Sequence, residues 1–313
     1  MKLQQLRYLC EIANQELNLS KAAKKLHTSQ PGISKQIQLL EEELKVKIFI
    51  RNGKRLVKIT PPGEAILKIV ERMMQDTENL KRISQEFTHE VGGTLTIATT
   101  HTQARYVLPA VIKRFTARYP DVKLILRQGS PTQISTLVTS GEADIAIATE
   151  AIELFHELVM LPCYEWNRCI VVPPTHPLLK LKKLTLEAIA QYPIITYDFA
   201  FTGRSKINQA FESKKLSPNV VLTAIDSDVI KTYVELGLGI GILARMAFDP
   251  KRDKHLRSID ASHLFESSTT RIGISRNSYL RSYIFDFIEM FAPHLSETTI
   301  RTALQKNLEH PKS

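Results

Sequence analysis

The stretch that decides the fold of the N-terminal region is "NLSKAAKKLHTSQPGISKQIQLLEEEL", residues 18–44. Ser20 is placed to cap a short helix, and the two alanines of that helix allow close packing. Ser29 is placed to cap a longer helix with Pro31 in its first turn, where the missing N–H costs little. A short helix, a tight turn and a second helix form the unit that lays its second helix in the major groove of DNA.

The stretch that follows, "KIFIRNGKRLVKIT" at residues 47–60, predicts a β-hairpin. Two β-prone runs flank Asn52-Gly53, and Asn-Gly is a strong hairpin signal. The basic residues at its tip form a wing that is placed to reach phosphates or the minor groove. The expected DNA-contacting residues are Ser29, Gln30, Pro31, Ser34 and Lys35 in the helix and Arg51, Lys54 and Arg55 in the hairpin.

Positive charge is concentrated in this N-terminal region. Residues 1–60 hold 12 Lys and Arg against 5 Asp and Glu, a net charge of +7, whereas the remaining residues hold 30 against 27. Ordinary solvated surface charge would explain such an excess. A small basic module on a nearly neutral body also suits a polyanionic partner, because neutralised phosphates release counterions.

The bulk composition fits a globular protein. The 313 residues are enough for two or three domains, and 43% hydrophobic and 24% charged residues are ordinary values. The chain has no apolar run that could span a bilayer, and its amphipathic N-terminus lacks the apolar core of a signal peptide. Cys10, Cys163 and Cys169 show no metal-ligand spacing and an odd count, which favours buried thiols in the reducing cytoplasm.

A long helix is predicted over residues 61–87, after Thr60 as its cap. Its apolar positions alternate spacings of four and three as in a heptad pattern, with two polar interruptions: Ile66, Val70, Met73, Thr77, Leu80, Ser84 and Phe87. An amphipathic helix packed on its own domain would show the same pattern. We expect a dimerising linker, because a two-fold protein can read two half-sites. Val91-Gly92-Gly93 then ends the helix.

From Gly93 onward, strand and helix patterns alternate. Their order over residues 93–149 predicts a parallel sheet covered by helices, and a second unit of the same kind begins near Trp166. The strand "TTRIGISRN" at residues 269–277 and the helix that follows it are expected to return to the first unit. This arrangement would give two lobes joined by crossover strands.

Neutral polar side chains gather where these strands end. Thr100, Thr102 and Gln103 follow one strand at the start of a helix, and Thr149 follows another. Ligands bind beyond the carboxyl ends of such strands, and a helix N-terminus offers free N–H groups to an anion. A loop that merely caps its helix is the competing explanation. The candidate anion-site residues are Thr100, Thr102, Gln103, Thr149, Trp166 and Thr202.

Residues 17–64 resemble the winged helix-turn-helix of LysR-type transcriptional regulators. The resemblance is carried by the paired alanines, the Ser29-Gln30-Pro31 junction, the Leu40-to-Leu44 helix end and Thr60-Pro61-Pro62-Gly63 after the hairpin; Gly32 departs from it, since the family often has Ala there. It implies an α/β protein with an N-terminal winged helix-turn-helix, a long linker helix and a two-lobed effector domain like that of periplasmic binding proteins. The implied parts are residues 1–60 for DNA binding, 61–90 for the linker, 91–165 with 268–295 for effector subdomain I, 166–267 for subdomain II, and 296–313 as a C-terminal tail.

The body resembles, more narrowly, the LysR-type activators of cysteine biosynthesis. The matching motifs are "TTHTQARYVLP" (99–109), "GEADIAIATE" (141–150), "CYEWNRCIVVP" (163–173) and "TYDFAFTGRSKI" (196–207). The resemblance implies that the six candidate residues surround a small anionic effector, N-acetylserine or a sulfate-like anion. A related regulator that senses a different sulfur-pathway anion is the alternative. The implied partners are promoter DNA, a second copy of the chain as dimer or tetramer, and RNA polymerase.

Two other classes of function compete with a regulator. His101 beside threonines, and Asp198 near Thr202, are residue types found in hydrolase sites. No carboxylate is clearly placed to orient His101, and the sequence has no Gly-x-Ser-x-Gly elbow, P-loop or metal motif, so we expect neither catalytic residues nor a cofactor or metal. An architectural DNA-binding protein with a vestigial body would leave the threonine cluster unexplained.

Overall fold

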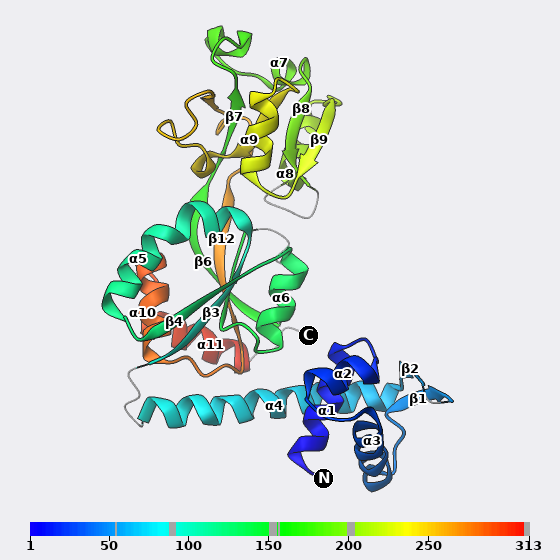
Figure 1. Ribbon diagram of the computed structural model, residues 1–313. Helices are drawn as coiled ribbons and strands as arrows, with labels where there is room; N and C mark the ends of the chain where they lie inside the picture. Colours follow the sequence, from blue (N-terminus) through cyan, green and yellow to red (C-terminus); the bar gives the residue numbers. More distant parts are fainter. Residues whose placement is uncertain (54, 88–91, 150–154, 156, 199–203, 310–313) are drawn as a thin grey trace. The chain divides into compact units, whose positions relative to one another are not determined.

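The protein is described by a computed structural model that covers residues 1–309 except 54, 88–91, 150–154, 156 and 199–203 (Figure 1). The chain divides into two compact units, of which the first contains residues 1–88 with 277–279 and the second contains the rest. No helix of the described residues is long and apolar enough to cross a membrane.

The first unit is a helical module with a two-stranded wing. Its elements are α1 (Leu3–Asn14), α2 (Leu19–Lys25), α3 (Gln30–Leu44), β1 (Phe49–Asn52), β2 (Arg55–Ile59) and α4 (Pro61–Phe87). One apolar core joins α1, α2 and α3, with Leu9, Ile12, Ile33 and Ile37 fully buried in it, and Val70 of α4 packs against the same core. The helix-turn-helix, the hairpin and the long helix that the sequence predicted are therefore all present.

Side-chain caps decide where these helices begin. The Ser29 hydroxyl accepts a hydrogen bond from the Gly32 amide (3.2 Å), as the sequence predicted. A Cβ at Gly32 would lie 3.0 Å from that hydroxyl, so a larger residue there would require the Ser29 side chain to shift by a few tenths of an ångström. The predicted cap at Ser20 is wrong. Asn18 caps α2 instead, because its Oδ1 accepts from the Ser20 and Lys21 amides and the helix begins two residues earlier than expected.

The second unit has two lobes, each built on a five-stranded sheet. The elements of lobe I are β3 (Gly93–Thr99), η1 (Gln103–Val107), α5 (Leu108–Arg118), β4 (Val122–Gln128), α6 (Pro131–Thr139), β5 (Ile145–Ala148), β6 (Leu158–Trp166), β12 (Ser268–Ser275), α10 (Ser282–Phe291) and α11 (Glu297–Glu309). The strand order is β4-β3-β5-β12-β6. One core lies under α5, α10 and α11, and a smaller one lies under α6 on the opposite face (Figure 1).

The C-terminal segment departs from the expectation of a tail. Residues 297–309 form α11, and Ile300 is fully buried in the core of lobe I with Ala303 and Leu304 packed beside it. These three residues lie at helical spacing, so that α11 places them all on one face. Lobe I therefore extends well beyond residue 295.

Lobe II repeats the same plan. Its elements are β7 (Arg168–Val172), η3 (Pro177–Lys180), α7 (Leu186–Ala190), β8 (Ile194–Tyr197), α8 (Arg204–Ser213), β9 (Val220–Ala224), α9 (Ser227–Glu235), β10 (Ile240–Ala244), η4 (Arg245–Ala247) and β11 (Arg257–Asp260). The strand order is β11-β7-β10-β8-β9, with α7 and α8 on one face and α9 on the other. The chain leaves lobe I through β6 and returns through β12, and these two strands pair from Trp166 opposite Ser268 to Leu158 opposite Ser275.

Candidate functional site

Three strands of lobe I bring threonines to one edge of its sheet. β3 and β5 are parallel neighbours with Thr99 opposite Ile147, so Thr100 and Thr149 both follow strand ends at the same edge. Each is only 8% exposed. β12 runs antiparallel to β5 with Arg271 opposite Ala148, which places Thr270 beside Thr149.

Thr270 is the centre of a buried hydrogen-bond cluster. Its hydroxyl oxygen accepts from the Gln103 side-chain amide and from the Trp166 indole N–H, both at 3.1 Å. The Thr149 hydroxyl lies 3.2 Å from the same oxygen. Three of the residues predicted from sequence are thus brought together, and the side chain that joins them was not predicted. We call these four residues and Tyr164 the Thr270 cluster.

Tyr164 fixes the orientation of the Gln103 side chain. The Tyr164 hydroxyl donates to the Gln103 carbonyl oxygen (2.5 Å), which leaves the amide N–H₂ directed at Thr270. Burial raises the pKa of Tyr164, although its bonds to Thr270 and Gln103 oppose the rise. The whole cluster is therefore uncharged near neutral pH, as expected for a site that uses dipoles instead of ammonium groups.

Thr102 points its hydroxyl toward lobe II. It is 2% exposed, and its buried Oγ1 forms no full hydrogen bond with the residues that the structure describes. Nearby Tyr197 of lobe II bonds to the Ser227 hydroxyl (2.7 Å) and accepts from the Ala244 amide (3.1 Å). Burial raises the pKa of Tyr197, and these two bonds and the Thr102 hydroxyl work against that rise. A buried hydroxyl whose hydrogen bonding is incomplete thus lies where the two lobes meet.

Contacts next to this hydroxyl join the two lobes. The π-helical turn η1 follows Thr102, and such turns are frequent at functional sites. From it, Tyr106 donates to Asp228 of α9 (2.6 Å) and Arg105 forms an ion pair with the same carboxylate (3.2 Å). Burial disfavours the charge on Asp228, but the Tyr106 hydroxyl, Lys231 and Arg105 outweigh it and hold its pKa below the usual value.

A buried positive charge lies against the ring of Trp166. The Arg168 side chain is fully buried, its guanidinium carbon is 5.2 Å from the centre of the Trp166 ring, and its Nη2 donates to the Ser268 hydroxyl (2.9 Å). The sequence prediction missed this residue. An arginine directly before the apolar strand residues Cys169 to Val172 was the available signal, because arginine is rarely fully buried unless it is paired.

Thr202, the sixth predicted effector residue, lies outside the described residues. The helix that follows, α8, begins with Arg204, which is 5% exposed. Burial lowers the pKa of Arg204, and the nearby Asp198 carboxylate opposes this.

Among the residues that the structure describes, one group of possible metal ligands comes together. Single ligand atoms of His101, Asp226 and Asp228 all lie within 4.8 Å of one another. Both carboxylates already serve the protein, because Asp226 caps α9 and Asp228 holds Tyr106 and Arg105. These contacts explain the cluster without a metal. Burial raises the pKa of Cys10 and Cys163 to about 12 and that of Cys169 to about 11, so the three cysteines remain neutral thiols.

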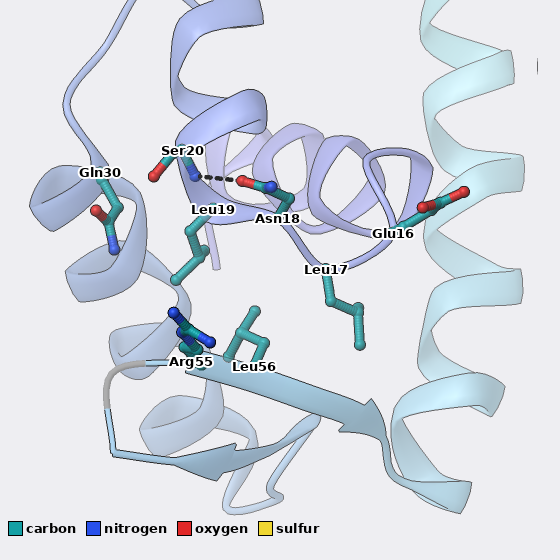
Figure 2. A pocket seen from close by; sticks show the side chains of 8 residues that line it. All are labelled: Glu16, Leu17, Asn18, Leu19, Ser20, Gln30, Arg55 and Leu56. Carbon is teal, nitrogen blue, oxygen red and sulfur yellow. Dashed lines mark hydrogen bonds between the residues drawn. The ribbon is translucent and has the colours of Figure 1, made fainter.

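The first unit presents most of the predicted DNA-contacting residues on its surface. Ser29, Gln30, Pro31 and Lys35 at the start of α3 are exposed, as is Arg55 of the wing, and Lys54 lies outside the described residues. Gln30 and Arg55 line a hollow of about 540 Å³ together with Asn18 and Ser20. Figure 2 shows these side chains around it. Ser34 and Arg51 differ from the others, because both are partly buried and Arg51 Nη1 donates to the Ser34 hydroxyl (3.2 Å).

Comparison with known proteins identifies both parts. Residues 3–64 match the family described as bacterial regulatory helix-turn-helix protein, lysR family, and residues 88–296 match the LysR substrate binding domain. The chain belongs to the LysR family. The family predicted from the sequence is thereby confirmed, and members of this family are transcription regulators and not enzymes.

Several LysR-family relatives cover almost the whole chain. The HTH-type transcriptional regulator SsuR of Burkholderia cenocepacia is 55% identical over 306 residues, which are 98% of this chain and 99% of that protein. The HTH-type transcriptional regulator CysB of the same organism is 53% identical over 309 residues, 99% of each chain. The crystal structure of the cofactor-binding domain of the Cbl transcriptional regulator superposes with a TM-score of 0.66 at 46% identity, covering 69% of this chain and 95% of that one.

Proposed function

We propose that this LysR-family regulator controls genes of sulfur assimilation and cysteine biosynthesis in response to a small anion bound between its two lobes. N-acetylserine is the first candidate for that anion. The similarity to CysB at 53% identity supports this choice, and the similarity to SsuR at 55% supports the alternative of a different sulfur-pathway anion.

The observation that carries the proposal is the buried Thr102 hydroxyl beside the Thr270 cluster. A buried polar group without a full partner costs free energy, so a position of this kind favours a ligand that completes its hydrogen bonds. Thr100 and Thr149 directly follow the ends of neighbouring strands at the same edge, and Arg168 supplies a buried positive charge against the Trp166 ring. We place the anion among Thr100, Thr102, Gln103, Thr149, Trp166 and Thr202.

The anion acts by favouring one arrangement of the lobes. Thr102 directly precedes η1, whose Tyr106 and Arg105 bind Asp228 of lobe II. A ligand that bonds to Thr102 therefore acts on the segment that joins the lobes. It shifts the equilibrium only to the extent that it binds one arrangement more tightly than the other.

We propose that α3 enters the major groove of DNA. We also propose that the protein acts in the cytoplasm of the cell. Gln30, Pro31, Ser34 and Lys35 would face base edges, while Lys54 and Arg55 would contact phosphates. Ser29 caps α3 and holds its N-terminus in place. At its promoters such a regulator would meet RNA polymerase.

A second copy of the chain is the proposed partner of α4. Met73 and Leu80 of the heptad pattern are 37% and 69% exposed in the single chain, while Val70 is used by the helix-turn-helix core. Apolar residues repeated along one helix at this spacing are suited to helix–helix pairing.

Thermal-shift measurements on the full-length protein test the proposal. We expect N-acetylserine to raise the unfolding temperature and N-acetylserinamide, which lacks the carboxylate, to leave it unchanged. At a hundredfold excess over the dissociation constant, the expected stabilisation is about 2.7 kcal/mol. Sulfate and thiosulfate distinguish the alternative anions, and mass spectrometry of the native protein identifies a retained ligand. A protein that none of these anions stabilises, and that retains no anion, would contradict the proposal.

A further inference from the structure

Arg51 is the one predicted wing residue whose described side chain turns into the protein. Its side chain is 22% exposed, whereas Arg55 on the paired strand is exposed. The register of the hairpin shifts between Ile50 and Arg51, and a β-bulge of this kind redirects the side chains next to it. The sequence did not show this shift, which is why Arg51 was expected to contact DNA alongside Lys54 and Arg55.

The charge that Arg51 faces is a buried carboxylate on α3, that of Glu41. The Glu41 side chain is fully buried, and its Oε1 accepts from the Ile48 and Phe49 amides at 2.9 and 3.1 Å. Its Oε2 lies 3.9 Å from Arg51 Nη2 and 3.6 Å from the Nζ of the exposed Lys47. A buried carboxylate needs nearby positive charge, so Arg51 is held in place by α3 itself.

The other nitrogen of the same guanidinium reaches Ser34. Arg51 Nη1 donates to the Ser34 hydroxyl oxygen at 3.2 Å, one turn along α3 from Gln30 and next to Lys35. A hydroxyl that accepts from a cation is polarised so that its own hydrogen points away from that cation. Ser34 is therefore prepared to donate a hydrogen bond outward.

We infer that Arg51 is a specificity-determining residue that acts through Ser34, holding its hydroxyl as a donor to an acceptor on a base edge. The inference rests on the proposed placement of α3 in the major groove. Guanine O6 and N7, adenine N7 and thymine O4 are acceptors there, whereas cytosine offers an amino donor. Arg51 itself makes no phosphate contact in this assignment. Lysine cannot replace it, because an ammonium is a point charge and does not span Glu41 and Ser34 as the planar fork does.

Selection and binding experiments on the full-length protein test this assignment. The wild type selects an operator from a random-sequence DNA pool, and a shuffled duplex of equal length measures non-specific affinity. We expect Arg51→Lys and Ser34→Ala to weaken the base preference at the same single position of the operator. Each should also lower the ratio of specific to non-specific affinity about tenfold. The double variant should be no worse than either single variant. The dependence of affinity on salt should not change, because no phosphate contact is lost.

Arg55→Ala is the matched control, since it removes an exposed wing cation. It should weaken all DNA alike and reduce the salt slope by about 1. If Arg51→Lys keeps the wild-type base preference while Arg51→Ala reduces the salt slope, Arg51 is a phosphate contact and the assignment is wrong. Additive effects of Ser34→Ala and Arg51→Lys, or relaxation of different base positions, would also overturn it. Should Arg51→Lys fail to fold, Ser34→Ala decides alone, because unchanged preference at every position excludes a role for the hydroxyl. If the wild-type protein binds no DNA at all, the proposed function itself is refuted.

Discussion

Replacing Thr270 by valine tests the buried cluster most sharply. Valine has the shape of threonine without the hydroxyl, so the change removes one oxygen from the centre of the cluster. That oxygen accepts from the Gln103 amide and the Trp166 indole, both at 3.1 Å. The two N–H groups belong to residues that are 1% and 8% exposed, so water does not readily replace the lost acceptor.

The expected cost follows from those two donors. Each buried donor left without its acceptor costs about 1–3 kcal/mol, which gives about 2–6 kcal/mol for the pair. For a folded unit of this size class, about 1 kcal/mol lowers the unfolding temperature by about 2–4 °C, so the smaller estimate already predicts a fall of about 4–8 °C.

Differential scanning fluorimetry of the full-length protein measures this fall. Thr269→Val is the matched control, because it makes the same chemical change on the same strand at the neighbouring, opposite-facing position. We expect the control to unfold close to the wild-type temperature. Equal unfolding temperatures for Thr270→Val and the wild type would refute the argument that Thr270 holds the cluster together.

The remaining predictions concern DNA contacts, pairing and pH. Lys54→Ala combined with Arg55→Ala should weaken specific and non-specific DNA alike and reduce the salt slope by about 2 in gel-shift titrations; an unchanged slope excludes phosphate contacts by the wing. Leu80→Glu in the exposed seam of α4 should dissociate the oligomer in sedimentation experiments, since a buried unpaired charge is costly, while Arg72→Glu should not; an intact Leu80→Glu oligomer would exclude the seam. Asp228→Asn should lower the unfolding temperature at neutral pH. Because the folded pKa of Asp228 lies below its ordinary value of 3.8, its ionised form stabilises the fold above that pH, and the difference from wild type should shrink as the pH falls below it; a constant difference would contradict this linkage.

Local patterns in the sequence predicted most of the architecture. Hydrophobic periodicity indicated α3 and α4, Asn52-Gly53 indicated the hairpin, and the strand and helix order indicated two lobes. The start of α2 shows the limit of such reasoning. Asn18 and Ser20 are both good caps, and only the structure shows that Asn18 is used and that Ser20 already lies inside the helix.

Long-range pairing could not be predicted in the same way. Thr270 lies 121 residues from Thr149 and 167 from Gln103, and in its own segment it is an ordinary threonine in a β-strand. Its importance arises only when β12 pairs with β5. The buried face of α11 could have been found, because Ile300, Ala303 and Leu304 have helical spacing, but they stand in a polar sequence with few apolar neighbours.

The most direct test of the central claim is a calorimetric titration of N-acetylserine into full-length wild type, Thr102→Ala and Thr102→Ser. The account predicts that Thr102→Ser, which keeps a hydroxyl, binds nearly as the wild type does. Thr102→Ala should lose about 1.5–3 kcal/mol, or roughly ten- to a hundredfold in affinity, while remaining folded. Equal affinity of a folded Thr102→Ala variant and the wild type would contradict the account, because the anion would then bind elsewhere.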